Sequence, residues 1–313
     1  MRILLTGGSG FVGRVLTATL AGGGHTVRLA LRTDNATPAG DLPRVIVGEI
    51  GSRTDWHAAL SGVDAVVHAA GRAHVGATDD AERLMEVNAR GTDCLARAAV
   101  RAGVRRFIFV SSVKVNGEGL AEHAYSRDDA PAPGDDYARS KLQGELALAR
   151  AAVGSAMEAI IVRPPLVYGP EVRANFLRLL VWVHRGWPLP LGAVRNRRSL
   201  VSVWNLCDLL RTLIEHPHAR GTWMVSDGED LSTPELLGAL GEAMGRRPRL
   251  LPVPPWMLDA AGTALGQRGQ IRRLCGSLVV DSAATRSALG WSAPVPVREG
   301  LRRTVEWYLQ ADR

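Results

Sequence analysis

The sequence predicts an α/β protein with a doubly wound parallel sheet and a smaller C-terminal lobe. Short apolar strands alternate with amphipathic helices through residues 2–162, which is the pattern of a parallel sheet that carries helices on both faces. The first strand, residues 2–6, continues directly into a glycine-rich turn and a helix. Both observations favour a fold that binds ligands at the carboxyl ends of its strands.

The glycine-rich turn has the spacing Gly7-x-x-Gly10-x-x-Gly13. Glycines at these places allow a tight turn, close approach of backbone N–H groups to a pyrophosphate, and close packing of the helix on the strand. A glycine-rich hairpin would leave the amphipathic helix that follows unexplained. The turn therefore predicts a dinucleotide site formed by Gly7, Ser9, Gly10, Phe11, Val12 and Gly13.

The second strand, residues 26–31, should end beside the adenosine ribose of such a dinucleotide. An acid at this place suits the 2′-OH of NAD, whereas an arginine suits the 2′-phosphate of NADP. Arg32 follows the strand and Arg28 lies within it, so the sequence favours NADP over NAD. Asp34 would serve as the ribose acid if the strand ran longer, and Arg32 would then be a solvated loop residue.

The later strands supply further candidates for the dinucleotide site. We expect strands at residues 45–47, 64–71, 106–110 and 159–162, a long helix at 81–102, and another helix from residue 136. Small side chains at a strand end let a cofactor lie against the backbone. The candidate positions are Glu49, Ile50, Ala69, Ala70, Gly71, Asn88 and Pro164. His68 is expected to be a packed strand-end residue and not a catalyst.

The segment Tyr137-Ala138-Arg139-Ser140-Lys141 opens the helix expected from residue 136. Residues four apart share one helix face, so Lys141 is expected beside Tyr137, where its charge would lower the pKa of the phenol. The phenol would then donate and accept a proton near neutral pH. A single Tyr-x-x-x-Lys also occurs by chance on solvated helices, so the prediction depends on the motifs that precede it.

The composition limits the compartment in which the protein works and the classes of partner that it binds. The three cysteines are odd in number and widely spaced, which argues against a disulfide framework or a zinc site and favours a reducing compartment, so we expect a cytoplasmic protein. Apolar residues 250–265 are broken by prolines and an acid, so no membrane span is expected. The net charge of +7 is spread along the chain, which suits a polyphosphate ligand better than a nucleic acid.

Five ordered motifs together resemble the extended short-chain dehydrogenases/reductases of the NAD-dependent epimerase/dehydratase type. They are Thr6-Gly7-x-x-Gly10-x-x-Gly13, His68-Ala69-Ala70, Ser111-Ser112, Tyr137-x-x-x-Lys141 and Arg163-Pro164-Pro165-Leu166-Val167-Tyr168-Gly169-Pro170. The resemblance covers nearly the whole chain. It implies a dinucleotide-binding domain of residues 1–164 and 201–230, and a substrate-binding lobe of residues 165–200 and 231–313.

The resemblance also implies that Ser112, Tyr137 and Lys141 form the catalytic set. Ser112 is preferred to Ser111 because it stands five residues before Gly117, as in the family's Ser-x-x-Val-Tyr-Gly segment. Tyr137 would move a proton to or from a sugar hydroxyl or ketone while the nicotinamide moves hydride at the same carbon. Ser112 would bind the oxygen, and Lys141 would hold the nicotinamide ribose.

The family pattern suggests residues for a nucleotide diphosphate sugar in the smaller lobe. By position these are Asn175 for the sugar nucleotide, Arg198 for the diphosphate, and Arg272 with Arg273 for a phosphate. Arg195, Arg197 and Arg198 together could form an anion clamp. Prolines and Trp256 in residues 251–258 are expected to form a rigid apolar wall.

One departure from the family pattern reduces the number of reactions that the resemblance allows. The related 4,6-dehydratases carry Asp-Glu directly after the catalytic Thr or Ser, whereas this chain has Val113 and Lys114, so dehydration is not expected. Lys114 would either contact substrate or be solvated, and the sequence favours neither. Asn116 stands where the family has tyrosine, and its effect is left open.

The favoured function is therefore an NAD(P)-dependent nucleotide-sugar oxidoreductase that acts at the sugar C4, of the 4-epimerase type. A nucleotide-4-keto-sugar 4-reductase, or a reductase of another ketone, would use the same residues. A non-catalytic NADP-binding sensor on the same fold is the alternative of another class. Family likeness also implies a homodimer built on the helix at 81–102 and the helix that carries Tyr137.

Overall fold

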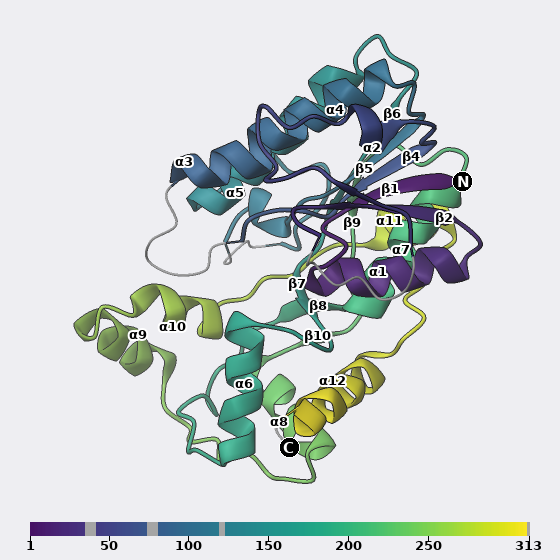
Figure 1. The fold of residues 1–313 in the computed structure, drawn as a ribbon. Coiled ribbons are helices and arrows are strands. Elements are labelled where there is room, and N and C mark those ends of the chain that lie inside the picture. Colours follow the sequence, from purple (N-terminus) through teal and green to yellow (C-terminus); the bar gives the residue numbers. More distant parts are fainter. Residues whose placement is uncertain (35–41, 74–80, 119–122, 312–313) are drawn as a thin grey trace.

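The computed structural model describes residues 1–34, 42–73, 81–118 and 123–311. Its core is a parallel sheet, as the sequence predicts, and the structure gives the strand order β3-β2-β1-β4-β5-β6-β9 (Figure 1). The strands are β1 (Arg2–Thr6), β2 (Thr26–Leu31), β3 (Arg44–Ile46), β4 (Ala65–His68), β5 (Arg106–Val110), β6 (Glu158–Arg163) and β9 (Gly221–Met224). The strand order reverses between β1 and β4, which is where this architecture binds ligands.

Helices cover both faces of the large sheet (Figure 1). On one face α1 (Phe11–Gly22) packs on α7 (Val203–Glu215), and their leucines join the core with β1 and β2. On the other face α4 (Gly91–Arg101) packs on α5 (Asp136–Ala152). The short helices α2 (His57–Leu60), α3 (Ala81–Leu84) and α11 (Ala283–Leu289) lie at its margins.

The smaller lobe is built on a second sheet in the order β10-β8-β7. Its elements are β7 (Leu166–Tyr168), α6 (Ala174–Arg185), β8 (Arg198–Ser202), β10 (Asp230–Leu231), α8 (Thr233–Ala243), α9 (Pro255–Ala264), α10 (Arg268–Cys275) and α12 (Val297–Ala311). Apolar residues of α6, α8 and α12 form a separate core. The boundaries 1–164 with 201–230, and 165–200 with 231–313, stay a prediction.

Most expected elements are present within a residue or two of their predicted ends. Helix α8 begins with a capping box formed by Ser232 and Glu235, in which each side chain accepts a hydrogen bond from the other residue's backbone N–H. Within the described residues, no helix is long and apolar enough to cross a membrane.

Two expectations about local structure were wrong. The helix expected at 81–102 is interrupted by a π-helical segment, η1 (Met85–Arg90), between α3 and α4. Residues 251–258 do not form an apolar wall, because Pro255 starts α9 and Trp256 is 71% exposed. Proline suits the first turn of a helix, since its missing N–H would have no partner inside the helix there.

Candidate active site

The glycine-rich turn is closely packed against its neighbours. A Cβ on Gly13 would lie 1.9 Å from the carbonyl oxygen of Gly7, and a Cβ on Gly7 would lie 2.6 Å from the N of Ala70. Gly7 has φ +75°, a left-handed conformation that favours glycine. The N–H of Gly10 donates to the Gly7 carbonyl at 2.9 Å, and α1 begins directly afterwards, with Ser9, Phe11 and Val12 partly buried around its first turn.

Buried hydrogen bonds fix the ends of β1 and β4 beside this turn. Thr6 Oγ1 lies 2.6 Å from His68 Nδ1 and accepts the N–H of Ala70 at 3.1 Å. The other ring nitrogen of His68 lies 3.1 Å from Thr92 Oγ1. Burial, reinforced by the charge of Lys141, lowers the pKa of His68 to about 3. His68 is thus a neutral, packed strand-end residue.

The π-helical segment η1 presents Asn88 to the helix that carries Tyr137. The amide of Asn88 donates to Ser140 Oγ and to the Arg72 carbonyl, both at 2.9 Å, and its oxygen accepts the Arg72 N–H at 2.8 Å. A Cβ on Gly71 would lie 3.0 Å from Lys141 Nζ and 3.2 Å from Asn88 Oδ1. The backbone at Gly71, which carries no side chain, therefore passes between Lys141 and Asn88, two of the predicted site residues.

Tyr137 and Lys141 lie on α5, as predicted. The helix is capped by Asp135, whose carboxylate accepts the N–H of Ala138 at 2.7 Å. The ammonium of Lys141 donates to the Val110 carbonyl at 2.9 Å and lies 4.6 Å from the centre of the Phe109 ring. Burial lowers the pKa of Lys141 to about 8.

The expectation that Lys141 lowers the pKa of the phenol was wrong for the chain without ligands. Burial, together with the negative charge of Asp135, raises the pKa of Tyr137 to about 12, although a hydrogen bond with Ser112 opposes both effects. The ammonium of Lys141 is bound to a backbone carbonyl instead. Tyr137 and Ser112 are nevertheless paired, as the catalytic prediction requires.

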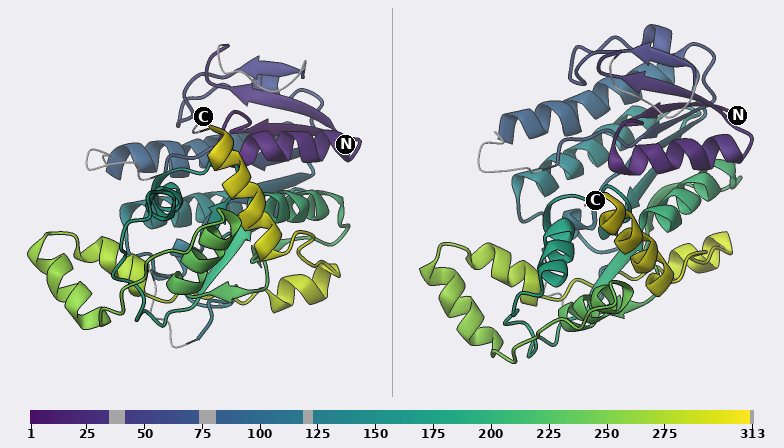
Figure 2. Two further views of the ribbon diagram at one scale, coloured as in Figure 1. Left: turned by 90° about the horizontal axis from the view of Figure 1, so that it is seen from below. Right: turned by 60° about the horizontal axis from the view of Figure 1, so that its bottom comes forward.

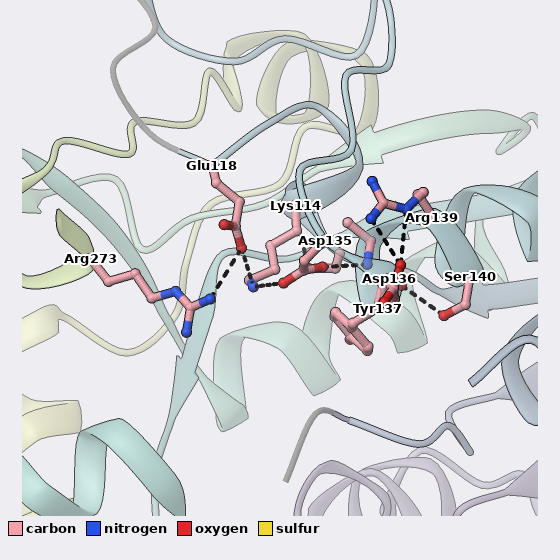
Figure 3. Close-up of polar contacts among 10 residues, drawn as sticks. Lys114, Glu118, Asp135, Asp136, Tyr137, Arg139, Ser140 and Arg273 are labelled. Carbon is pink, nitrogen blue, oxygen red and sulfur yellow. Dashed lines mark hydrogen bonds and ion pairs between the residues drawn. The ribbon is translucent and has the colours of Figure 1, made fainter. Parts of the chain in front are cut away.

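Lys114 is a partly exposed residue that is held in two ion pairs. Its ammonium is bound by the carboxylates of Glu118 and Asp135, the latter at 2.7 Å, and it lies 6.0 Å from the centre of the Tyr137 ring (Figure 3). Arg273 of α10 lies 3.9 Å from Glu118. Burial alone would raise the pKa of Asp135, but the bonds from Lys114 and from the Ala138 N–H hold it below its usual value.

A buried ion pair behind the site was missed by the sequence analysis. Arg163 donates to Glu145 at 2.6 and 3.0 Å, and a third guanidinium hydrogen bond reaches Asn116 at 3.1 Å. Ser111 also donates to Glu145, so its role at the strand end is structural. A signal was available, because Glu145 follows Lys141 by one turn on the buried face of α5 and a buried carboxylate needs a partner. The hydrogen bond from Arg163 therefore gives Asn116 a structural role, which its position in the family motif alone did not indicate.

The strand-end residues near β3 border a cavity of about 570 Å³. Glu49 and Ile50 line it, together with Arg72 and Glu86. Arg32 does not belong to its lining; it is exposed just after the end of β2. Beyond it, the exposed Asp34 lies 3.6 Å from Arg44.

Two of the three arginines of the predicted anion clamp, Arg197 and Arg198, already have partners. Arg198, whose pKa is lowered by burial, donates to the carbonyls of Arg273 and Gly276, and Arg197 pairs with Asp230 at 2.9 Å. The anion clamp with Arg195 is therefore not preformed.

Two further residues of that lobe lie near its surface. The guanidinium of Arg272 lies 3.7 Å from Asp259. Asn175 is exposed in the first turn of α6, directly after Ala174, whose φ of +53° is unusual for a residue with a side chain. Pro164 is buried, and its carbonyl accepts the N–H of Val113, next to Ser112, at 3.0 Å.

The fold and the site together define a dinucleotide-binding protein. The glycine turn and the small residues after β4 lie at the switch point of a doubly wound sheet, and Lys141 of α5 reaches the Gly71 backbone beside them. The model of the NAD dependent epimerase/dehydratase family matches residues 3–225. A UDP-glucose 4-epimerase of Vibrio cholerae is 43% identical over 99% of this chain and 96% of its own length. The chain belongs to the NAD dependent epimerase/dehydratase family, so the resemblance predicted from its motifs is confirmed.

Solved structures of related fold cover the whole chain. The UDP-glucose 4-epimerase of Thermotoga maritima, solved with UDP-glucose, superposes with a TM-score of 0.81 at 21% identity, and each chain is covered completely. The UDP-glucuronic acid 4-epimerase of Bacillus cereus, solved with NAD, superposes with a TM-score of 0.80 at 20% identity, again over both complete chains. At this identity the likeness establishes the fold.

Proposed function

We propose that this chain is an NAD-dependent 4-epimerase of nucleotide sugars, with a UDP-hexose as substrate. The observation that carries the proposal is the Tyr137–Ser112 pair on a closely packed dinucleotide turn. The 43% identity to a UDP-glucose 4-epimerase over almost the full length of both chains supports the same substrate class.

The residues present fit a dinucleotide. At Gly7 and Gly13 the turn is packed too closely on the protein's own backbone to admit a Cβ, which holds the start of α1 against the strand ends. α1 therefore begins where a pyrophosphate would meet its positive end. We assign NAD, because the family is NAD dependent and the related Bacillus cereus enzyme was solved with NAD. The NADP preference inferred from Arg32 gains no support from either source.

In this proposal Tyr137 and Ser112 handle the proton at the C4 oxygen. When bound, the nicotinamide would accept hydride from C4 and return it to the other face of the ring. To act as the base, Tyr137 would have to be in its phenolate form, which the positive charge of a bound oxidised nicotinamide would favour. In that form Tyr137 takes the hydroxyl proton in the first half of the reaction and gives it back in the second, while Ser112 holds the oxygen. Lys141 stays close to the Gly71 backbone, where it would bind the cofactor's ribose.

A nucleotide-4-keto-sugar reductase is the second candidate. Because the pKa of Tyr137 is raised to about 12, the phenol is protonated at neutral pH and ready to give its proton to a ketone. Such an enzyme would release its oxidised cofactor after one hydride transfer.

The nucleotide released when the purified protein is denatured separates the two candidates. An epimerase is expected to release about one NAD per chain, because it regenerates its cofactor in place. A chain that carries no nucleotide, and that NADPH saturates from solution, would overturn the epimerase proposal and leave the reductase.

We also propose a homodimer built on α4 and α5, where Leu146 of α5 is 43% exposed. The three cysteines are unpaired, which supports our proposal of a reducing compartment, the cytoplasm.

A further inference from the structure

The segment that joins β7 to α6 in the smaller lobe, residues 169–173, runs beside the glycine-rich turn of the dinucleotide site. α1, which follows that turn, lies on the side of the large sheet that faces the smaller lobe (Figures 1 and 2). A Cβ on Gly169 would lie 3.5 Å from a carbon of the Phe11 ring, at the start of α1. Phe11 packs against the cores of both lobes, so the first turn of α1 lies where the two lobes meet.

Buried side chains anchor this segment, but its backbone has an unusual conformation. Tyr168 and Val172 are buried, and the Tyr168 ring stacks on that of Phe176 with the ring centres 5.5 Å apart. Between these anchors Glu171 has φ +67°, and Ala174, the first residue of α6, has φ +53°. Among the residues that the structure describes, these two are the only ones besides glycine with a positive φ. Because a left-handed φ is unfavourable for a residue with a side chain, other contacts must hold the segment in place.

An ion pair ties the segment to the glycine-rich turn. Arg14 Nη1 donates to Glu171 Oε1 at 2.7 Å, and Arg14 Nε donates to the carbonyl of Ser9, in the turn itself, at 3.1 Å. One guanidinium therefore binds the turn and the segment together. The side chains of Arg14 and Glu171 are 45% and 40% exposed, so added salt should weaken their ion pair.

We propose that Arg14 and Glu171 are positioning residues that keep the dinucleotide in its site. Their ion pair holds residues 169–173 against the turn whose backbone N–H groups would meet the pyrophosphate. When the ion pair opens, the strained backbone at Glu171 relaxes, the segment moves away from the turn, and the dinucleotide leaves faster. The inference rests on the dinucleotide site of the proposed function, and it suits an epimerase, which regenerates its cofactor in place.

The rate at which NAD leaves the purified full-length chain during dialysis tests the proposal, with the remaining NAD measured after denaturation of timed samples. Glu171→Gln should lose NAD about fivefold faster than the unaltered chain, near the upper limit for a partly exposed ion pair. Removal of a negative charge would by itself favour the anionic pyrophosphate and slow the loss, so the direction of the change separates the two effects. Arg14→Gln, and the double variant with Glu171→Gln, should match the single variant, because each removes the same interaction. High salt should speed the loss from the unaltered chain and leave the double variant unchanged.

Glu242→Gln is the matched control, because Glu242 of α8 pairs with Arg298 of α12 at 2.8 Å, within the smaller lobe. It should lose NAD at the unaltered rate. An unchanged or slower loss in Glu171→Gln, an equal acceleration in the control, or additive effects in the double variant would overturn the proposal.

The failure of the proposed function would be seen separately. A chain that purifies without nucleotide contradicts the epimerase proposal alone. The ion pair is then tested by the dissociation constant of added NADPH, which should rise about fivefold in Glu171→Gln and stay unchanged in Glu242→Gln. Equal constants in Glu171→Gln and the unaltered chain would overturn the role of the pair.

Discussion

The pKa of Tyr137 depends on residues that lie outside the Tyr-x-x-x-Lys motif. Asp135 caps α5 and its charge disfavours the phenolate, whereas the hydrogen bond with Ser112 favours it. Lys114 binds the Asp135 carboxylate at 2.7 Å and so balances a negative charge beside the phenol. The residue expected to tune Tyr137, Lys141, instead donates to a backbone carbonyl.

Two substitutions should move the pKa of Tyr137 in opposite directions. Asp135→Asn removes a negative charge that raises this pKa, so the pKa should fall, by about one unit. Lys114→Met leaves the charge of Asp135 without its partner, so the pKa should rise. Ultraviolet titration of the phenol, as a difference from Tyr137→Phe, measures both shifts.

Asp136→Asn is the control for this pair, because Asp136 is exposed and bound to Arg139 at 2.8 Å. It should leave the pKa of Tyr137 close to that of the unaltered chain. Shifts of the same sign in Asp135→Asn and Lys114→Met would contradict the account of this network.

At the scale of single elements, α1 depends on close contact with the strand that precedes it. Gly13 and Gly22 both lie in this helix, but their surroundings differ. A Cβ on Gly13 would lie 1.9 Å from a backbone oxygen, which cannot move aside as a flexible side chain can. At Gly22, an added Cβ would have no atom of the described residues within 4 Å apart from its chain neighbours and the backbone of its own helix.

Gly13→Ala should therefore destabilise the chain by about 2 kcal/mol or more and abolish dinucleotide binding, because α1 must move away from the turn. Gly22→Ala should leave stability equal or raise it by about 0.5 kcal/mol, since alanine favours helix. Urea unfolding measures the free energies. Equal effects of the two substitutions would contradict the role assigned to close packing.

The buried Glu145–Arg163 pair ties α5 to the carboxyl end of β6. Glu145→Ala should cost about 3–5 kcal/mol of unfolding free energy, because it leaves the Arg163 charge buried without its partner. The exposed pair of Glu242 and Arg298, at 2.8 Å, supplies the control, and Glu242→Ala should have little effect. A small loss from Glu145→Ala would show that water replaces the carboxylate.

At the scale of the whole molecule, the prediction of the fold depended mainly on the alternation of strands and helices along the chain and on the spacing of the glycines after the first strand. Apolar spacing and turn residues are local signals, so the parallel sheet could be predicted from the sequence. The catalytic set of Ser112, Tyr137 and Lys141 was inferred from the family resemblance and stays a prediction. The π-helical turn at Asn88 could not, since helical spacing is nearly the same for α and π segments over one turn.

Partners of charged residues were the least predictable feature. Lys114 and Glu118 are four residues apart, but the rest of their network comes from α5 and α10, which only the tertiary fold brings together. For the same reason, the sequence could not show that Arg198 bonds backbone carbonyls. Such contacts decide the charge near Tyr137.

The central claim is that Tyr137, with Ser112, transfers the proton at C4 of a nucleotide sugar. Proton NMR of UDP-glucose incubated with the purified chain tests it directly. The account predicts that UDP-galactose accumulates to equilibrium without added cofactor, and that Tyr137→Phe slows this by about 10²- to 10⁴-fold while the bound NAD is retained. An equal rate in Tyr137→Phe, or no interconversion by a chain that holds NAD, would contradict it.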